Sequence, residues 1–321
     1  MELASVVIPT FNRKARLARV LEALARQTVD PSLFEVVIVD DGSSDGTGEW
    51  LASQQRAFGI RAISQTNGGP ARARNTALHA ARGRYLVFLD DDVQPIPTFL
   101  AEHLACQQQN EQTVVLGPLS SLSHYEQPWV AWEQAKLELQ YQAMVRGDWA
   151  PTFRQFWTGN ASVERSYVVA EGGFNVEFLR GEDVELGFRL HLRGLKFLFN
   201  PRAQGFHHAE RSLDSWMHAH ESYGRLEVDV FKRNGEEELV TVLGANWRRL
   251  HPATRLLVKQ CLSRPLPYAA TIRALKGVLQ AERKLGRSVL APKACGVLAN
   301  LLYWQASVAA LGPALAARVL D

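Results

Sequence analysis

The chain is predicted to be an α/β protein, with a mostly parallel sheet flanked by helices and a helical extension at its carboxyl end. Short apolar runs alternate with segments of helical period through about residue 100, which implies right-handed βαβ units. Polar clusters follow three of those runs, and residues 240–321 read as helical. These three observations together predict the fold class.

The apolar runs predict buried strands. Ser5–Pro9 and Glu35–Val39 are rich in β-branched residues and do not alternate with polar ones, as in strands that are covered on both faces. Tyr85–Leu89 is a third run of this kind, with glycine before it and proline after it. Further strands are predicted at Arg61–Ser64, Thr113–Gly117 and Leu195–Phe199.

The segments between these strands predict helices. Leu17, Val20, Leu21 and Leu24 recur at the spacing of one helical face. Pro70 suits the first position of a helix that runs to Ala81 and is capped by Gly83. Other helices are predicted over Gly48–Phe58, over Trp129–Met144 and after Gly181.

Polar residues follow the first, second and fourth predicted strands, at Thr10–Arg13, Asp40–Thr47 and Asp90–Asp92. Parallel sheets bind their ligands beyond the carboxyl ends of the strands, so these clusters should share one site. Three consecutive carboxylates repel one another and call for a positive partner. A divalent cation such as Mg²⁺ or Mn²⁺, carrying phosphate groups, would supply it. Taken by itself, the triplet could equally be a solvated acidic turn.

Composition and charge narrow the class of protein. An apolar fraction of 46% and a charged fraction of 21% are ordinary for a globular chain. The net charge of +3 conceals an asymmetry, because residues 241–321 carry 12 Lys and Arg against two acidic residues. A basic tail on an acidic body suggests a separate partner for the tail, with anionic lipid and nucleic acid as the two candidates.

Several other classes are excluded by missing motifs. The first strand is followed by Pro-Thr-Phe-Asn-Arg, so the chain lacks the GxGxxG of a dinucleotide-binding domain, and it has no P-loop. Its three cysteines are widely spaced, which suits a reducing cytosol and excludes a zinc motif. The first residues lack the basic and apolar regions of a signal peptide.

Taken in order, the motifs resemble those of the family 2 glycosyltransferases, inverting enzymes of the GT-A fold that use a nucleotide-sugar donor. The resemblance covers roughly residues 3–225. It rests on the collinear blocks VVIPTFNR, VDDGSSDGT, NGGPARARN, FLDDD, GNAS, GGF and GEDVELGFR, followed by His207. Each block alone is weak, whereas their shared order is specific.

The resemblance implies roles for particular residues. The donor nucleotide would be bound by Pro9, Phe11, Asp40, Asp41, Asn67, Arg74 and Asp91. Mn²⁺ or Mg²⁺ would be held by Asp90, Asp92 and His207, although His208, His218 and His220 are nearby and leave the choice of histidine open. Trp157, Asn160 and Glu182 would lie on the acceptor side. For Phe11, simple core packing is the alternative, and for Arg74 a solvated helix face.

Asp183 is the candidate general base that the resemblance implies. Inversion at an anomeric carbon is a single in-line displacement, so a carboxylate must take the proton of the acceptor hydroxyl on the face opposite the leaving diphosphate. Asp183 stands at a predicted helix start, where a carboxylate is favoured by unpaired backbone N–H groups. A helix cap without catalytic function is the alternative.

These predictions give a GT-A glycosyltransferase domain over residues 1–235 and a basic, apolar helical extension over residues 236–321. The expected activity is transfer of a sugar to a glycan or a lipid-linked acceptor, in the cytoplasm or at the inner face of the membrane. The alternatives are a sugar nucleotidyltransferase and a non-catalytic, membrane-associated relative. In the extension, residues 294–317 have no charge, but a Gly312-Pro313 break favours a buried or interfacial helix over a spanning one. Glu236–Glu238 is predicted to be a solvated linker, and nucleic acid is not expected as a partner.

Overall fold

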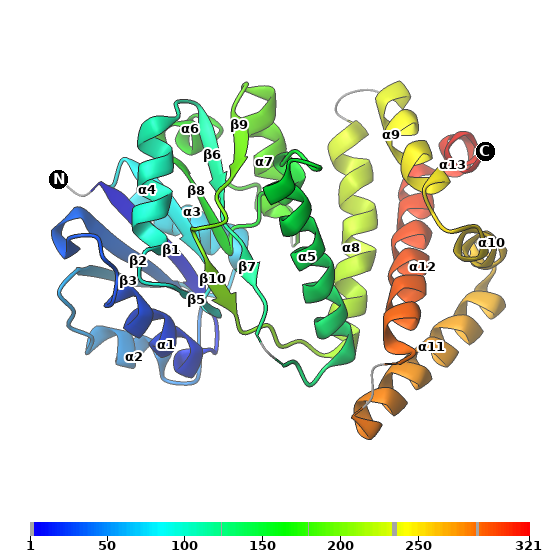
Figure 1. Cartoon of the computed structure of the whole chain (residues 1–321), viewed down its shortest axis with the longest axis horizontal. Helices are drawn as coiled ribbons and strands as arrows, with labels where there is room; N and C mark the ends of the chain where they lie inside the picture. The colour runs from blue at the N-terminus through cyan, green and yellow to red at the C-terminus, as the bar shows by residue number, and fades with distance from the viewer. Residues whose placement is uncertain (1–2, 123, 179, 233–235, 287–288) are drawn as a thin grey trace. The chain divides into compact units, whose positions relative to one another are not determined.

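The computed structural model describes residues 3–122, 124–178, 180–232, 236–286 and 289–321. It divides into two compact units (Figure 1). The first consists of residues 1–122 and 136–209, and the second of residues 123–135 and 210–321. The long helix α5 (Pro128–Arg146) therefore contributes its first residues to the second unit and the others to the first.

A seven-stranded sheet with the order β3-β2-β1-β4-β8-β6-β9 forms the centre of the first unit. All of its strands are parallel except β8, which is antiparallel to both of its neighbours. The bounds are β1 (Ala4–Thr10), β2 (Phe34–Asp40), β3 (Gly59–Ser64), β4 (Tyr85–Leu89), β6 (Thr113–Leu116), β8 (Asn160–Glu164) and β9 (Lys196–Phe199). The predicted α/β fold with a mostly parallel sheet is confirmed.

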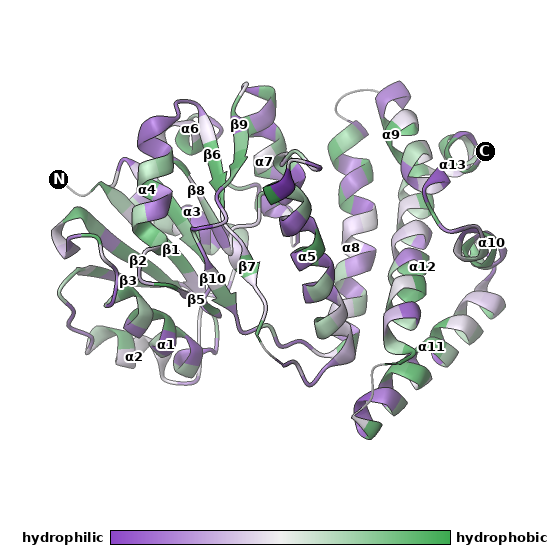
Figure 2. Ribbon diagram, viewed as in Figure 1, coloured by the Kyte–Doolittle hydropathy of each residue, from purple (hydrophilic) through white to green (hydrophobic). Residues whose placement is uncertain are grey.

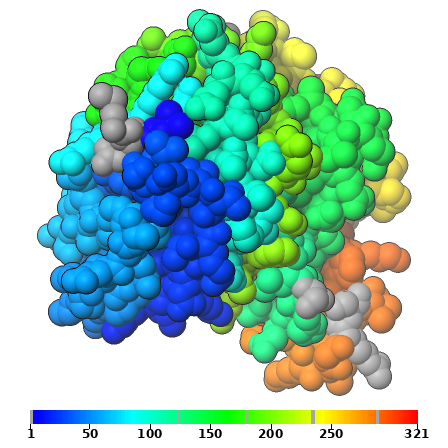
Figure 3. All heavy atoms as spheres, turned by 60° about the vertical axis from the view of Figure 1, so that its left-hand side comes forward, coloured from blue at the N-terminus to red at the C-terminus, as the bar shows by residue number. Residues whose placement is uncertain are grey.

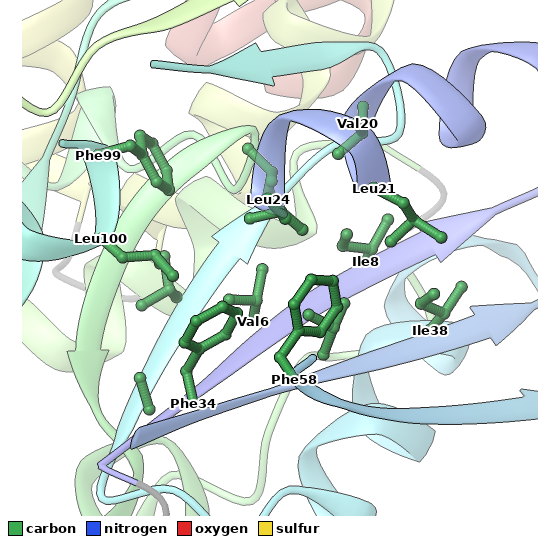
Figure 4. Packing of buried hydrophobic residues seen from close by; sticks show 14 of the residues in the cluster. Val6, Ile8, Val20, Leu21, Leu24, Phe34, Ile38, Phe58, Phe99 and Leu100 are labelled. Carbon is green, nitrogen blue, oxygen red and sulfur yellow. The ribbon is translucent and has the colours of Figure 1, made fainter. Parts of the chain in front are cut away.

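Helices cover both faces of this sheet. Val20, Leu21 and Leu24 of α1 (Lys14–Leu24) point onto β1 and β2 (Figure 4). The same cluster receives side chains from α2 (Thr47–Ala52) and α4 (Phe99–Gln109). The helix α3 (Gly69–Ala80) packs on β1 and β2 without joining the cluster, so it covers the opposite face. The remaining helices of this unit are α6 (Arg165–Ala170) and α7 (Glu182–Leu192), with short 3₁₀ turns at Pro31–Leu33 and Phe153–Gln155.

A second, three-stranded sheet has the order β5-β10-β7, with β5 (Val93–Pro95), β7 (Leu119–Ser120) and β10 (Gly205–His207). Strand β5 begins directly after the Asp90–Asp92 triplet, and β10 is antiparallel to it. This small sheet therefore fixes a late segment of the chain beside the acidic turn. The space-filling view in Figure 3 shows the chain up to α4, blue to cyan, as one continuous surface.

The second unit is helical. Its helices are α8 (Leu213–Lys232), α9 (Glu236–Arg248), α10 (Pro252–Cys261), α11 (Pro265–Leu285), α12 (Ala291–Leu311) and α13 (Pro313–Leu320). Among the described residues α12 is the one helix long and apolar enough to cross a membrane, and 56% of its apolar window is buried inside the protein. Gly224 lets α8 approach α12 closely, since a Cβ there would lie 2.2 Å from the carbonyl oxygen of Tyr303. The packing identifies α12 as the core of this unit.

Several local predictions need correction. The helix predicted over Gly48–Phe58 is the short α2, which ends at Ala52. Gly83 does not cap α3; it lies against β1, where a Cβ would come 2.4 Å from the carbonyl carbon of Ala4. Glu236–Glu238 is the first turn of α9, where carboxylates are favoured by the helix dipole. The predicted division after residue 235 also differs from the observed one, because α8 packs on α12 and belongs to the second unit.

Candidate active site

The loops that follow β1, β2 and β4 are joined by hydrogen bonds at one edge of the sheet. The three strands are parallel neighbours, so their carboxyl ends lie together. Thr10 Oγ1 donates to Asp91 Oδ2 at 2.7 Å. Asn12 accepts from the backbone N–H of Ser44, at 2.8 Å, and its own N–H donates to Ser43 Oγ. The predicted convergence of three polar strand ends is therefore observed.

Arg13 neutralises the acidic turn. Its Nη1 lies 2.9 Å from Asp91 Oδ1 and 2.9 Å from Asp92 Oδ2, and Arg16 Nη1 lies 3.7 Å from the same oxygen of Asp92. Both carboxylates are largely buried, at 5% and 9% side-chain exposure. Burial raises the pKa of Asp91 to about 6, against the attraction of Arg13. Arg13 and Arg16 thus supply positive charge at this turn, and the divalent cation that the sequence predicted there stays a prediction.

His207 is brought to the acidic turn by the small sheet. In the pairing of β10 with β5 it stands opposite Val93, the residue after Asp92. Its Nε2 lies 3.6 Å from Asp92 Oδ1. His208 instead has its Nε2 3.2 Å from Gln94 Oε1. The backbone N–H of His208 donates to the carbonyl oxygen of Asp92 at 2.8 Å, but among the two side chains the distances favour His207 as the partner of the Asp92 carboxylate.

The donor set at this turn has the chemistry that Mn²⁺ or Mg²⁺ requires. Asp92 and His207 offer a carboxylate oxygen and an imidazole nitrogen, and Mg²⁺ and Mn²⁺ commonly take further oxygens from substrate phosphates. Across the described ranges, no three His, Cys, Asp or Glu side chains are grouped so that they could hold a metal ion. Binding of a metal ion by Asp90, Asp92 and His207 therefore stays a prediction.

Asp90 is held by a buried arginine, Arg74, whereas Asp91 and Asp92 are held by Arg13. Arg74 Nη2 donates to Asp90 Oδ1 at 2.9 Å, and Arg74 Nη1 donates to Glu182 Oε1 at 2.6 Å. The Arg74 side chain is 6% exposed, so the alternative of a solvated helix face is wrong. Gly159 leaves room for the Asp90 carboxylate, since a Cβ there would come 2.9 Å from its Oδ2. Through Arg74 the acidic turn is connected to the start of α7.

Asp183 is the second residue of α7 and is partly exposed. Its pKa is raised to about 7, chiefly by burial and then by the charge of Glu182, against the attraction of Arg74. Asp90 also raises this pKa, which places Asp183 within electrostatic reach of the acidic turn. A carboxylate that titrates near neutral pH is suited to general base catalysis.

The predicted nucleoside-binding carboxylates are occupied within the protein. Asp41 accepts from the side chain of Gln65 and from the backbone N–H groups of Gly68 and Gly69, at 2.7–2.9 Å. Asp40 accepts from the backbone N–H of Ser43 at 3.0 Å. Both are buried, so they shape the loops beside the site. Gly42 permits this arrangement, because its φ is +83° and a Cβ would come 2.9 Å from the backbone nitrogen of Asn67.

Other predicted donor residues present surface at this edge. Phe11 is 46% exposed, which contradicts the alternative of simple core packing. Asn67 is also exposed, and Pro9 is half-buried at the end of β1. Contact of these three residues with a nucleoside stays a prediction.

Asn160 does not line an acceptor surface, as the sequence had suggested. It is 2% exposed, and its amide nitrogen donates to the carbonyl oxygens of Pro118 and Ala203. Its Oδ1 lies 2.8 Å from His103 Nε2. This buried network fastens the end of β8 to two neighbouring segments, so the GNAS block has a structural role here.

The other two acceptor-side residues differ from each other. Glu182 is buried and committed to Arg74, so it is a charge partner within the site rather than a contact surface. Trp157 is half-buried, and its ring packs edge-on against Tyr141 at a centroid distance of 6.4 Å. Its contact with an acceptor stays a prediction.

Arg13 is the residue that the sequence reasoning placed in a polar loop but did not assign to the site. The signal was present, because three consecutive carboxylates need a cation and Arg13 follows the neighbouring strand. What the sequence did not contain was the direction of its side chain.

Comparison with known proteins places these features in a family. Residues 5–167 match the model of glycosyl transferase family 2. Validoxylamine A glucosyltransferase of Streptomyces hygroscopicus subsp. limoneus is 34% identical over 232 residues, which cover 63% of this chain and 51% of that protein. An uncharacterized glycosyltransferase of Bacillus subtilis, YfnE, is 32% identical, covering 60% of this chain and 62% of the relative. The chain thus spans about half to three-fifths of the curated relatives it matches.

Solved structures show the same fold. Residues 1–349 of S. aureus TarS superpose with a TM-score of 0.58 at 17% identity, covering 98% of this chain and 92% of the other. The mannosyltransferase PcManGT of Pyrobaculum calidifontis, solved with GDP-Man and Mn²⁺, gives a TM-score of 0.56 at 21% identity. That match covers 99% of this chain and 78% of PcManGT. At these identities the likeness concerns the fold.

Proposed function

Because the chain belongs to glycosyl transferase family 2, we propose that it transfers a sugar from a nucleotide-diphosphate donor to a glycan or lipid-linked acceptor with inversion. The observation that carries the proposal is that the Arg74 guanidinium donates hydrogen bonds to both Asp90 and Glu182. It joins the acidic turn to the helix start that carries Asp183. A donor diphosphate and an attacking hydroxyl would need to meet between two such groups.

In the proposed reaction the acceptor hydroxyl oxygen forms a bond to the anomeric carbon while the bond from that carbon to the diphosphate breaks. Asp183 takes the hydroxyl proton, and the nucleoside diphosphate leaves. A pKa of about 7 keeps much of Asp183 ionised at neutral pH while leaving it basic enough to accept a proton.

The acidic turn would bind the diphosphate end of the donor. Asp92 and His207, with Asp90 as the third candidate, would hold Mn²⁺ or Mg²⁺, which offsets negative charge on the leaving diphosphate when bound. Arg13 and Arg16 add positive charge at the same place. PcManGT, which shares the fold, was solved with Mn²⁺ and GDP-Man, and this supports the cation.

The donor nucleoside would lie over the loop after β1, against Phe11 and near Asn67. An exposed ring at the end of a strand can cover a base. Asp40 and Asp41 would act indirectly, by holding the turns on either side. Neither the base nor the sugar follows from these residues. We also propose that the enzyme works in the cytoplasm.

The proposal is tested with a panel of UDP- and GDP-sugars, measuring Mn²⁺-dependent donor binding and slow donor hydrolysis. Asp183→Asn should abolish transfer and hydrolysis while donor affinity stays nearly unchanged. Glu177→Gln, an exposed carboxylate shortly before α7, is the matched control and should keep full activity. Transfer at the normal rate by Asp183→Asn would remove Asp183 from the reaction.

Product analysis separates this reaction from that of a sugar nucleotidyltransferase. Glycosyl transfer releases a nucleoside diphosphate, whereas a nucleotidyltransferase acting on a sugar phosphate releases pyrophosphate. The nucleotidyltransferase reaction also has no use for Asp183. Absence of donor binding across the whole panel would favour a non-catalytic relative.

A further inference from the structure

The helix α11 has an uncovered face along its whole length. Of its 21 residues, Leu279 and Glu282 are buried, whereas α12 has the same length and buries eleven. The exposed face recurs at helical spacing and consists of Leu266, Ala270, Arg273, Gly277, Ala281 and Lys284. Most of its residues are small and apolar, Arg273 and Lys284 are long and basic, and the exposed Gln280 lies at its edge.

Large apolar side chains are exposed at both ends of this helix. Leu266 is 84% exposed and Leu285 is 64% exposed, at the first and last turns. Val289 follows at 75%, and Leu256 on the preceding helix α10 is 60% exposed. In Figure 2 hydrophobic and hydrophilic residues alternate along the α11 ribbon, in agreement with this mixture. Several large apolar side chains exposed along one helix and its flanks indicate an interaction surface rather than single scattered residues.

From α10 to α13 nearly all charged residues are basic, although the neighbouring α8 brings Asp214 and Glu221 close to α11. Residues 241–320 contain a single acidic residue, Glu282. It is buried, and its carboxylate accepts from the backbone N–H groups of Leu290 and Ala291 at the start of α12. Glu282 is therefore used in joining α11 to α12 and does not neutralise the outer surface. Lys276, at the edge of the helix, is paired with Asp214 of α8, so Arg273 and Lys284 are the basic residues of the outer face.

We propose that this face of α11 docks on an anionic lipid bilayer. Small residues let the helix backbone lie close to the interface, the leucines at its ends enter the acyl region, and Arg273 and Lys284 extend to lipid phosphates. A second copy placed face to face would bring like charges together. Nucleic acid would gain nothing from exposed leucine and valine side chains. The helix α12 is the buried core of this unit, so the docking is peripheral.

The test is co-sedimentation of the full chain with vesicles of phosphatidylcholine alone and of phosphatidylcholine with phosphatidylglycerol. The chain should bind the anionic vesicles and not the neutral ones, and binding should weaken at about 1 M salt, where charges are screened beyond roughly 3 Å. Arg273→Gln with Lys284→Gln should weaken binding by about tenfold or more, since each basic residue near the surface contributes about 1 kcal/mol. Leu266→Ser with Leu285→Ser should also weaken binding.

Arg26→Gln with Arg56→Gln removes the same charge from exposed positions of the first unit and is the matched control. It should leave vesicle binding unchanged. Absence of binding to anionic vesicles at low salt would overturn the proposal. An equal loss of vesicle binding in the control variant would also overturn it, because the attraction to anionic lipid would then depend on the net charge of the protein and not on α11. Tighter binding to duplex DNA or RNA than to vesicles, lost in the Arg273 and Lys284 variant, would assign the surface to nucleic acid instead.

Discussion

Arg74 and Glu182 form a buried ion pair, with 2.6 Å between Nη1 and Oε1 and side-chain exposures of 6% and 8%. The two residues lie on different helices, α3 and α7. A buried charge is tolerated when it is paired, and here each member also influences Asp183. The pair thus links the stability of the sheet edge to the properties of the proposed base.

Replacing Arg74 with leucine should destabilise the protein strongly, because Glu182 would be left as an uncompensated buried charge. Removing one partner of a buried pair costs about 3–5 kcal/mol. Urea unfolding of the variant measures this loss. Arg84→Leu breaks an exposed pair with Glu164 and should cost below about 1 kcal/mol. Equal losses of unfolding free energy in the two variants would mean that the buried Arg74 pair stabilises the protein no more than an exposed pair does.

The acidic limb of kcat/KM should lie near pH 7 and should depend on Glu182. The parameter kcat/KM reports the free enzyme, in which Asp183 has a pKa of about 7 and must be ionised to act as base. Activity should therefore rise with pH through this range. Glu182→Gln removes a negative charge that raises this pKa, so the limb should move to lower pH. Glu177→Gln should leave the limb in place, and a limb that is also unmoved in Glu182→Gln would separate Asp183 from the profile.

The buried network around His103 makes the fold sensitive to acid. Because the Asn160 amide nitrogen donates to two carbonyl oxygens, its Oδ1 must accept, and His103 Nε2 must carry the proton. Burial lowers the pKa of His103 to about 4, so its neutral form is the one that the folded state favours. The contribution of His103 to stability is complete above 6.5, its pKa in the unfolded chain, and is lost as the pH falls toward 4.

When the pH is lowered from about 7.5 to about 5, His103 should lower the free energy of unfolding by about 2 kcal/mol. Urea unfolding at the two pH values measures the loss, and His103→Gln should show a smaller one. Some acid sensitivity should remain in the variant, since burial also lowers the pKa of His220 to about 4. An unchanged pH dependence in His103→Gln would contradict the proposed tautomer and its burial.

The sequence predicted the strands well because buried parallel strands have a composition of their own. Runs such as Tyr85–Leu89 coincide with β4 residue for residue. The position of β8, antiparallel between β4 and β6, could not be read in this way, because strand order depends on contacts between distant segments. The helix after β2 was also predicted too long. The apolar Phe58 was counted as part of that helix, whereas it packs into the core cluster from a non-helical segment after α2.

The site was predicted unevenly, and the errors have a physical pattern. Residues whose chemistry requires a partner, such as the Asp90–Asp92 triplet, were correctly placed at the sheet edge. Asn160 was misplaced because an amide in a glycine-rich turn reads as surface, whereas its burial depends on Pro118 and Ala203 far away in the sequence. Arg13 was missed because a side chain's direction is decided by tertiary contacts.

Removing the imidazole of His207 should weaken metal-dependent donor binding, whereas removing that of His208 should not. His207 Nε2 lies 3.6 Å from Asp92 Oδ1, while His208 Nε2 is beside Gln94. The two histidines are adjacent on the same short segment, so a general disturbance of that segment would affect both variants alike. Titration of donor binding with Mn²⁺ measures the effect, and His207→Ala should need about tenfold or more Mn²⁺ if it supplies a ligand.

The same titration in the presence of a chelator gives the baseline. Donor affinity of the unaltered protein should fall to that of Asp92→Asn when the cation is withdrawn, because both changes leave the diphosphate without the metal cation at this turn. If His208→Ala raised the Mn²⁺ requirement and His207→Ala did not, the ligand would be the other histidine. Donor binding indifferent to chelation would instead assign the diphosphate charge to Arg13 and Arg16, which already lie within 2.9 Å and 3.7 Å of Asp92.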